Sequence, residues 1–223
     1  MNDVLRRRYD LVVFDVDGTL VGSRDGRVVW RLINDRFLGD QEIDDQRWQA
    51  FLQGELLYED WVRLDVEGWQ SAGLSRERIS SAIAADLYPM PGAKETIATL
   101  SDAGYRVAVI SGTLNLTLEV LLPDCRFDAV FTNHVEFDDQ GKISGWRATP
   151  YDMAGKADGL HRVCEELAVP VERAVFVGDN VNDIEIMKVA GFAIAYEPKA
   201  PSVADVADVV IEGDLRQLIE LID

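Results

Sequence analysis

The sequence predicts an α/β fold in which a parallel sheet is interrupted by an inserted helical domain. Three observations support this prediction. An apolar run at residues 9–14 ends in acidic residues, as a buried strand does when it leads into a site. From residue 105 onward, short apolar runs alternate with helical stretches, which is typical of right-handed βαβ crossovers. Residues 22–89 show no comparable strand and repeat their apolar side chains at helical spacing.

The first predicted strand is followed at once by the sequence DVDGT. Open parallel sheets place their ligands beyond the carboxyl ends of the strands, so Asp15 and Asp17 should stand at the mouth of a site. Two carboxylates so close together repel each other unless a cation or a shared proton is present. The pair therefore predicts a metal, and Gly18 predicts a tight backbone turn beneath it.

The insert is predicted to contain about four helices. Apolar residues recur with helical spacing from Val28 to Phe37, and again from Tyr58 to Trp69. In the second stretch Asp65 shares a helical face with Trp61 and Trp69, where an acid is costly unless it is paired or faces solvent. The predicted domains are a sheet domain of residues 1–21 and 90–223 and a helical domain of residues 22–89.

The later part of the chain predicts the remaining sheet. Strands are expected at 105–110, 128–131, 174–179, 192–196 and 207–211, with helices near 114–122, 155–168 and 215–222. Residues 133–148, with DDQG at their middle, predict a β-hairpin or flap.

Three further segments bring polar residues to the same edge of this sheet. The strand expected to end at Ile110 presents Ser111 and Gly112 at a strand-to-helix turn, where a hydroxyl and free N–H groups can hold a phosphate oxygen. Lys156 is expected at the start of a helix. The run VFVGDNVND leaves its strand with three polar residues: Asp179, Asn182 and Asp183. Each segment alone could be a turn, a helix cap or a surface lysine, but their combination in this order indicates a site.

The composition limits the partners. The 223 residues carry a formal net charge of -18, so nucleic acids and anionic membranes would be repelled. A high-salt habitat or a biased genome would each produce such an excess of acid. Cys125 and Cys164 form no spacing motif, and no apolar run reaches membrane-spanning length. We therefore expect reduced thiols, a cytoplasmic location and neither nucleic-acid nor membrane partners; oligomeric state is not predicted.

The four motifs resemble those of the haloacid dehalogenase (HAD) superfamily of aspartate-nucleophile phosphatases, and within it the phosphoserine phosphatase group. The resemblance rests on DVDGT at 15–19, SGT at 111–113, Lys156 and GDNVND at 178–183. It implies a Rossmann-like core of parallel strands with an inserted α-helical cap of the C1 type. It also implies Mg²⁺-dependent hydrolysis of a phosphomonoester through an aspartyl-phosphate intermediate.

The resemblance assigns a role to each acid. Asp15 would be the nucleophile, because a carboxylate with an ordinary pKa of about 4 is ionised at neutral pH and needs no base. Asp17 would act as acid and then as base, so its environment must raise its pKa. Mg²⁺ would be held by Asp15, the main-chain carbonyl of Asp17 and Asp179.

The remaining motif residues would surround the phosphate. Lys156 would supply positive charge, and Ser111 with the Gly112 amide would bind phosphate oxygens. Asn182 is placed among the phosphate- and substrate-binding residues and, with Asp183, would orient Lys156, the metal's waters or the flap.

Two positions depart from the phosphoserine phosphatase pattern, which has a glutamate soon after the first motif and an arginine in the cap. Those positions carry Arg24 and Asp65 here, so both charges are reversed, although the nearby Arg63 leaves the register of the cap open. We expect a small phosphorylated metabolite other than phosphoserine. Arg24 and Asp65 would face the cap cavity and either pair with each other or bind the substrate. A shifted register with an exposed Asp65 is the alternative.

Two other function classes stay open. A phosphotransferase or phosphomutase would retain both aspartates of the first motif and pass the phosphoryl group to an alcohol instead of water. A non-catalytic binding protein could retain the metal pocket, but it would have no need of an acid at Asp17.

Overall fold

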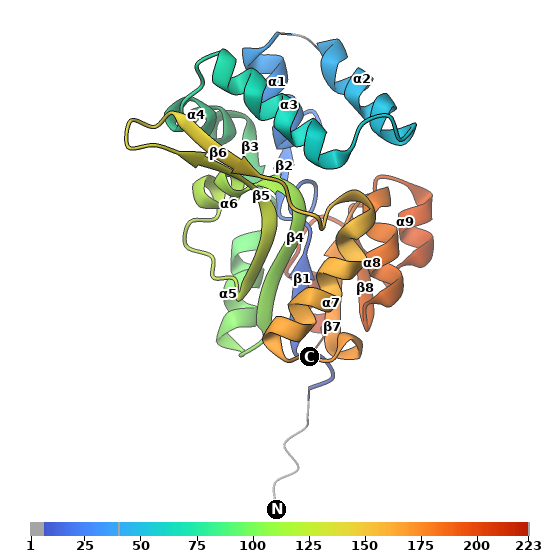
Figure 1. The fold of residues 1–223 in the computed structure, drawn as a ribbon. Coiled ribbons are helices and arrows are strands. Elements are labelled where there is room, and N and C mark those ends of the chain that lie inside the picture. The colour runs from blue at the N-terminus through green and yellow to red at the C-terminus, as the bar shows by residue number, and fades with distance from the viewer. Residues whose placement is uncertain (1–6, 40, 223) are drawn as a thin grey trace, which may run out of the picture.

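The computed structural model describes residues 7–39 and 41–222, and its centre is a seven-stranded sheet (Figure 1). The strand order is β6-β5-β4-β1-β7-β8-β9. The strands are β1 (Leu11–Phe14), β4 (Arg106–Leu114), β5 (Ala129–Phe137), β6 (Ile143–Arg147), β7 (Ala174–Gly178), β8 (Phe192–Tyr196) and β9 (Val209–Ile211). All neighbours pair in parallel except β5 and β6, which form the predicted hairpin. The predicted α/β fold with a parallel sheet is therefore confirmed.

Helices cover both faces of the sheet, so neither face of its central strands meets water and every residue of β1 is buried. One face packs against α7 (Lys156–Leu167), α8 (Ile184–Val189) and α9 (Pro201–Val206). The other packs against α5 (Ala93–Asp102), α6 (Asn115–Leu121) and α10 (Gln217–Ile222). Single 3₁₀ turns lie at Met153–Gly155, Val171–Arg173 and Val181–Asp183.

The four helices of the insert, called the cap below, lie above the carboxyl ends of the central strands (Figure 1). They are α1 (Val29–Phe37), α2 (Gln41–Leu52), α3 (Tyr58–Ser71) and α4 (Arg76–Asp86). Two short antiparallel strands, β2 (Val21–Ser23) and β3 (Leu87–Pro89), connect the cap to the sheet. These strands were not predicted, because three residues are too few to show a strand's alternation.

The end of β4 differs from its prediction. The strand does not stop at Ile110 but continues to Leu114, with a register irregularity between these two residues before pairing with Asn133 resumes. Such irregularities re-aim side chains at the edges of sites. Ser111 and Gly112 therefore lie on an irregular strand segment and not on a strand-to-helix turn.

None of the helices in residues 7–39 and 41–222 has the length and apolar character required to span a bilayer.

Candidate active site

The two aspartates of the first motif lie directly beyond β1. The backbone N–H of Asp15 still donates to Val177 of β7 at 2.9 Å, and the chain then turns through Gly18, whose φ is +96°. A Cβ on Gly18 would lie 2.1 Å from an oxygen of Asp179. Glycine is thus required both by the backbone conformation and by the approach of this second acid.

Lys156 joins the first acid to the last motif. Its Nζ donates to Oδ1 of Asp15 at 2.7 Å and to Oδ1 of Asp183 at 2.6 Å, and its side chain is 1% exposed. Burial lowers the pKa of Lys156, but the charges of Asp15 and Asp183 outweigh this effect and raise it above its usual value. The lysine is therefore a permanent buried cation beside the expected nucleophile.

Both acids of the first motif are shifted toward the protonated form. Burial raises the pKa of Asp15 to about 6, against the lowering effect of Lys156. Burial, followed by the charge of Asp15, raises the pKa of Asp17 to about 7. Asp15 is thus less acidic than its sequence suggested but still ionised at neutral pH, while Asp17 has the raised pKa that a general acid requires.

A buried cluster of carboxylates adjoins this pair. Asp15, Asp179 and Asp183 each offer an oxygen within 4.8 Å of the others. Burial, then the charges of Asp15 and Asp183, raise the pKa of Asp179 to about 8. Such crowding of buried acids is relieved by a cation, and an all-oxygen donor set suits Mg²⁺.

Within this cluster, the acids differ in how many hydrogen bonds their carboxylate oxygens already accept. Both oxygens of Asp183 already accept hydrogen bonds, from Lys156 and from the backbone N–H groups of Asp179 and Asn180 at 2.9 and 3.0 Å. The Asp179 carboxylate accepts a long hydrogen bond of 3.3 Å from Thr19, and its other oxygen lies 4.0 Å from the Lys199 ammonium. Asp15 and Asp179 are therefore the better cation ligands, and Asp183 holds the lysine and the loop.

Ser111 and Gly112 lie beside Asp15. Ser111 is buried, accepts from the Thr113 N–H at 3.2 Å and hydrogen-bonds to Asp15. The Gly112 carbonyl accepts from the Trp30 indole at 2.7 Å and from the Asn133 amide at 2.6 Å. These bonds fix the irregular segment of β4 and tie it to the cap.

Asp152 is a site residue that the sequence analysis missed. Its carboxylate lies so close to Gly112 that a Cβ there would be 1.9 Å away, and it accepts from Asn182 at 3.3 Å. It precedes a single 3₁₀ turn in the loop after the hairpin and belongs to no motif, so only the folded chain brings it to the site.

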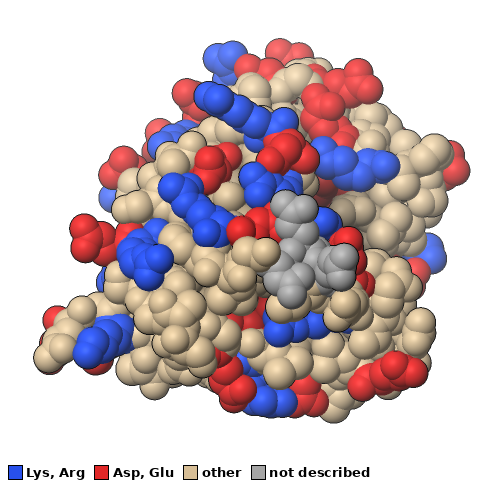
Figure 2. Space-filling model, turned by 90° about the horizontal axis from the view of Figure 1, so that it is seen from above, with Lys and Arg blue, Asp and Glu red and all other residues tan. Residues whose placement is uncertain are grey.

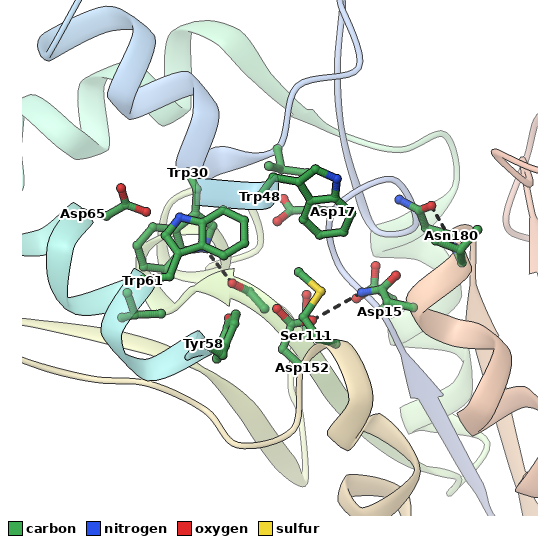
Figure 3. Close-up of a pocket in the computed structure, with 16 residues that line it drawn as sticks. Asp15, Asp17, Trp30, Trp48, Tyr58, Trp61, Asp65, Ser111, Asp152 and Asn180 are labelled. Carbon is green, nitrogen blue, oxygen red and sulfur yellow. Dashed lines mark hydrogen bonds between the residues drawn. The ribbon is translucent and has the colours of Figure 1, made fainter. Parts of the chain in front are cut away.

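A cavity of about 290 Å³ opens between these groups and the cap (Figure 3). Asp15, Asp17, Ser111, Gly112 and Asn182 line its sheet side, as the motifs predicted. Its other lining residues are Val28, Trp30, Trp48, Tyr58, Trp61, Val62, Asp65, Asp152, Met153, Asn180 and Val181. Of the cap aromatics, Tyr58 and Trp61 were expected on one face of a helix, and Trp30 and Trp48 were not singled out from the sequence.

The two cap positions have different outcomes. Asp65 lines the cavity and is 1% exposed, so the exposed alternative is wrong. Its Oδ1 accepts from Asn34 at 2.9 Å and forms an ion pair with Arg47, not with Arg24. Arg24 is exposed and is not among the lining residues, because it lies in the turn after β2 and not on a cap helix. Its predicted place in the cavity is wrong.

The family model for haloacid dehalogenase-like hydrolases matches residues 9–191. The phosphoserine phosphatase SerB2 of Mycobacterium tuberculosis is 36% identical over 91% of this chain, and the chain spans only 47% of that protein. The phosphoserine phosphatase of Methanocaldococcus jannaschii is 30% identical over 98% of this chain and is covered completely.

Solved structures extend the likeness to the fold. A substrate-bound phosphoserine phosphatase complex superposes with a TM-score of 0.75 at 29% identity, covering 98% of this chain and all of the other. A phospho-aspartyl intermediate analogue of phosphoserine phosphatase has a TM-score of 0.74 at 29% identity, covering 97% of this chain and all of the other.

Proposed function

The chain belongs to the haloacid dehalogenase-like hydrolases, as a phosphoserine phosphatase-like member, and we propose that it is a Mg²⁺-dependent phosphomonoesterase acting on a small metabolite other than phosphoserine. The observation that carries this proposal is the buried Asp15–Lys156 pair beside Asp179, at the floor of the cavity under the cap. We further propose that residues 22–89 act as a cap domain over residues 1–21 and 90–223.

The first step is attack by an Asp15 oxygen on phosphorus. At about 3.5 Å and an effective dielectric of ~20, each charge on the phosphate opposes this carboxylate by roughly 5 kcal/mol. Lys156 offsets part of this repulsion, with Ser111 and the Gly112 N–H as donors to phosphate oxygens. Mg²⁺, when bound by Asp15 and Asp179 with the Asp17 carbonyl, supplies the remaining positive charge.

Asp17 handles the proton. As the Asp15–phosphorus bond forms and the ester bond breaks, protonated Asp17 gives its proton to the departing alkoxide. Ionised Asp17 then takes a proton from the water that attacks the aspartyl-phosphate, releasing inorganic phosphate and restoring Asp15. Its raised pKa supports this double role.

The cavity lining supports a substrate other than phosphoserine. Of the described residues that line it, none is a lysine or arginine, and Lys156 is turned toward Asp15 and Asp183. A substrate carboxylate would therefore be desolvated without a cationic partner, beside the acids Asp65 and Asp152.

The decisive experiment is phosphate release from a panel of phosphomonoesters with and without a chelator. We expect Mg²⁺-dependent turnover with phosphoserine among the poor substrates. Asp15→Asn should lower kcat at least ~10³-fold, since it removes the nucleophile at nearly constant shape. Asp158→Asn, on the exposed side of α7, is the matched control. Full activity in Asp15→Asn would refute the mechanism, and transfer to an added alcohol in place of water would instead support a phosphotransferase.

A further inference from the structure

The cap side of the cavity is walled by aromatic rings. Trp30, Trp48, Tyr58 and Trp61 all line it, and in Figure 3 they lie between Asp65 on one side and Asp15 on the other. The ring centroids of Trp48 and Trp61 are 6.2 Å apart, with the planes tilted by 56°. Two indoles at this angle present ring surface to the cavity from two directions.

These rings are held by contacts outside the cavity. Trp30 stacks on the buried Trp69 at 5.1 Å, and Phe51 packs at 6.0 Å from Trp61 and 6.1 Å from Trp48. The indole N–H of Trp30 is used by Gly112, and the Tyr58 hydroxyl accepts from Asn133 at 2.7 Å. The polar atoms of Trp30 and Tyr58 are thus already bonded within the protein, and a ligand meets mainly ring surface.

The charges around this wall are negative. Of the described lining residues, four are aspartates and none is basic. A second hollow of about 890 Å³ shares Trp30, Trp48 and Trp61 with the first, and its charged residues are Asp25, Asp35, Asp44, Asp45, Arg27 and Arg31. Four acids against two arginines leave this approach negative as well, which favours a positively charged group.

Aromatic faces attract cations, most strongly where water is excluded. A primary ammonium is compact and strongly hydrated, so its three N–H donors would each need an acceptor. Asp65, the acid at the cap end of the wall, is already bonded to Asn34 and Arg47. A quaternary ammonium has no N–H donor and needs only ring surface and a negative surrounding, which this wall provides.

We propose that Trp30, Trp48, Tyr58 and Trp61 bind a quaternary ammonium group, and that the substrate class is phosphomonoesters of amino alcohols that carry one. This inference rests on the proposed function, because it places the phosphate at Asp15 and the cation in the cap. The cavity is small for a ligand pocket, and its volume therefore suits a short substrate of this class.

The test compares choline phosphate with 3,3-dimethylbutyl phosphate, which has the same shape with a carbon in place of the charged nitrogen. We expect kcat/KM to be about tenfold higher for choline phosphate, since a partly desolvated cation on aromatic rings is stabilised to roughly that extent. A ratio of one or below would overturn the inference.

Variants locate the effect. Trp48→Leu and Trp61→Leu should bring the ratio toward one, while Trp61→Phe should retain part of it because a π-face remains. Trp146→Leu is the matched control: this tryptophan on β6 does not line the cavity, so the ratio should be unchanged. An unchanged ratio in Trp48→Leu and Trp61→Leu would exclude the rings as its cause.

A binding measurement separates this inference from the proposed function. Choline and 3,3-dimethylbutanol are titrated into the Asp15→Asn variant, followed by tryptophan fluorescence and calorimetry. Tighter binding of choline without phosphate release by the wild type would uphold the ammonium site and refute the phosphatase. Phosphate release from acetyl phosphate by the wild type, together with no preference for choline in the variant, would uphold the phosphatase and refute the ammonium site.

Discussion

Lys156 is the residue through which the two halves of the site depend on each other. It bonds Asp15 at the end of β1 and Asp183 in the turn before α8, and all three side chains are almost fully buried. A buried ion pair contributes little net stability compared with apolar packing, but removing one partner leaves an uncompensated charge. One lysine therefore compensates the charge of two buried carboxylates.

We predict that Lys156→Met destabilises the protein by about 3–5 kcal/mol, because it strands two buried acids. Urea unfolding at pH 7.5 measures the change. Lys188→Met is the control, since Lys188 pairs with Glu185 on the exposed surface of α8 and its removal should change little. Equal stability of the two variants would contradict the assignment.

Asp17 makes activity depend on pH. An acid with a pKa of about 7 is protonated below that pH, so its ability to donate a proton is lost as pH rises through 7. A bound cation opposes the effect of burial and lowers the pKa of Asp17, so the decline begins at or below pH 7. On the acid side, protonation of Asp15 removes the nucleophile, and a cation bound to Asp15 moves this limit below the pKa of about 6 that burial gives it without a metal.

We therefore predict that kcat/KM for an alkyl phosphate falls up to tenfold per pH unit on the alkaline side, whereas an aryl phosphate, whose leaving group needs no proton, shows a weaker decline. Profiles from pH 5.5 to 8.5 for both esters test this. Asp17→Asn should slow the alkyl ester far more than the aryl ester, and parallel profiles for the two esters would argue against Asp17 as the acid.

At the scale of elements, the cap is joined by a buried polar network centred on Asn34 of α1. Its side-chain amide donates to Asp44 of α2 at 2.7 Å and to Asp65 of α3 at 2.9 Å, and its carbonyl accepts from Trp69 at 2.6 Å. One side chain thus fixes three helices and, through the Trp30–Trp69 stack, the aromatic wall of the cavity. Buried polar networks of this kind help to specify a single arrangement, although the second oxygen of Asp44 accepts no hydrogen bond from the described residues.

Asn34→Leu should destabilise the cap by about 2–4 kcal/mol, because two buried acids and an indole N–H each lose a hydrogen bond. Hydrogen exchange should show faster exchange in α1–α3 than in β1 and β7. Arg31→Ala, which removes an exposed pair with Asp45, serves as the comparison and should have little effect. Protection of the cap equal to that of the wild type would show that the network does not order it.

At the scale of the whole molecule, the acidic residues lie in two different environments, the solvent-exposed surface and the buried site. On the face seen from the cap side, basic and acidic side chains are interspersed without a broad basic area (Figure 2). Pairs such as Arg31–Asp45 and Arg36–Asp86 lie on the cap surface. The acids at the site are buried instead, and they repel one another most strongly in the absence of a cation.

Mg²⁺ should therefore stabilise the folded protein independently of turnover. At 100 times its dissociation constant it would add about 2.7 kcal/mol, or roughly 5–10 °C in Tm for a protein of this size. Thermal unfolding with Mg²⁺ and with a chelator measures this shift. Asp179→Asn should reduce it, whereas a full shift in that variant would place the cation elsewhere.

Sequence patterns predicted those helices and strands that depend on residues close together along the chain. The apolar run before Asp15, the alternation after Tyr105 and the helical spacing of the insert each depend on neighbours along the chain, and the parallel sheet with its helices was confirmed. The carboxyl-end rule also predicted which motif residues would meet, because parallel strands end at one edge. The catalytic roles of these residues stay predictions.

The sequence by itself determined the fold class, the family and the motif residues that line the sheet side of the cavity. Only the tertiary structure decided that Arg47 is the partner of Asp65, that Arg24 faces solvent and that Asp152 reaches Gly112. It also decided that four cap aromatics form one wall. The physical reason is that these contacts join segments with no shared periodicity, so they depend on how α1–α3 and the hairpin loop pack over the sheet. The raised pKa of Asp17 has the same origin, because burial is a property of the packed molecule.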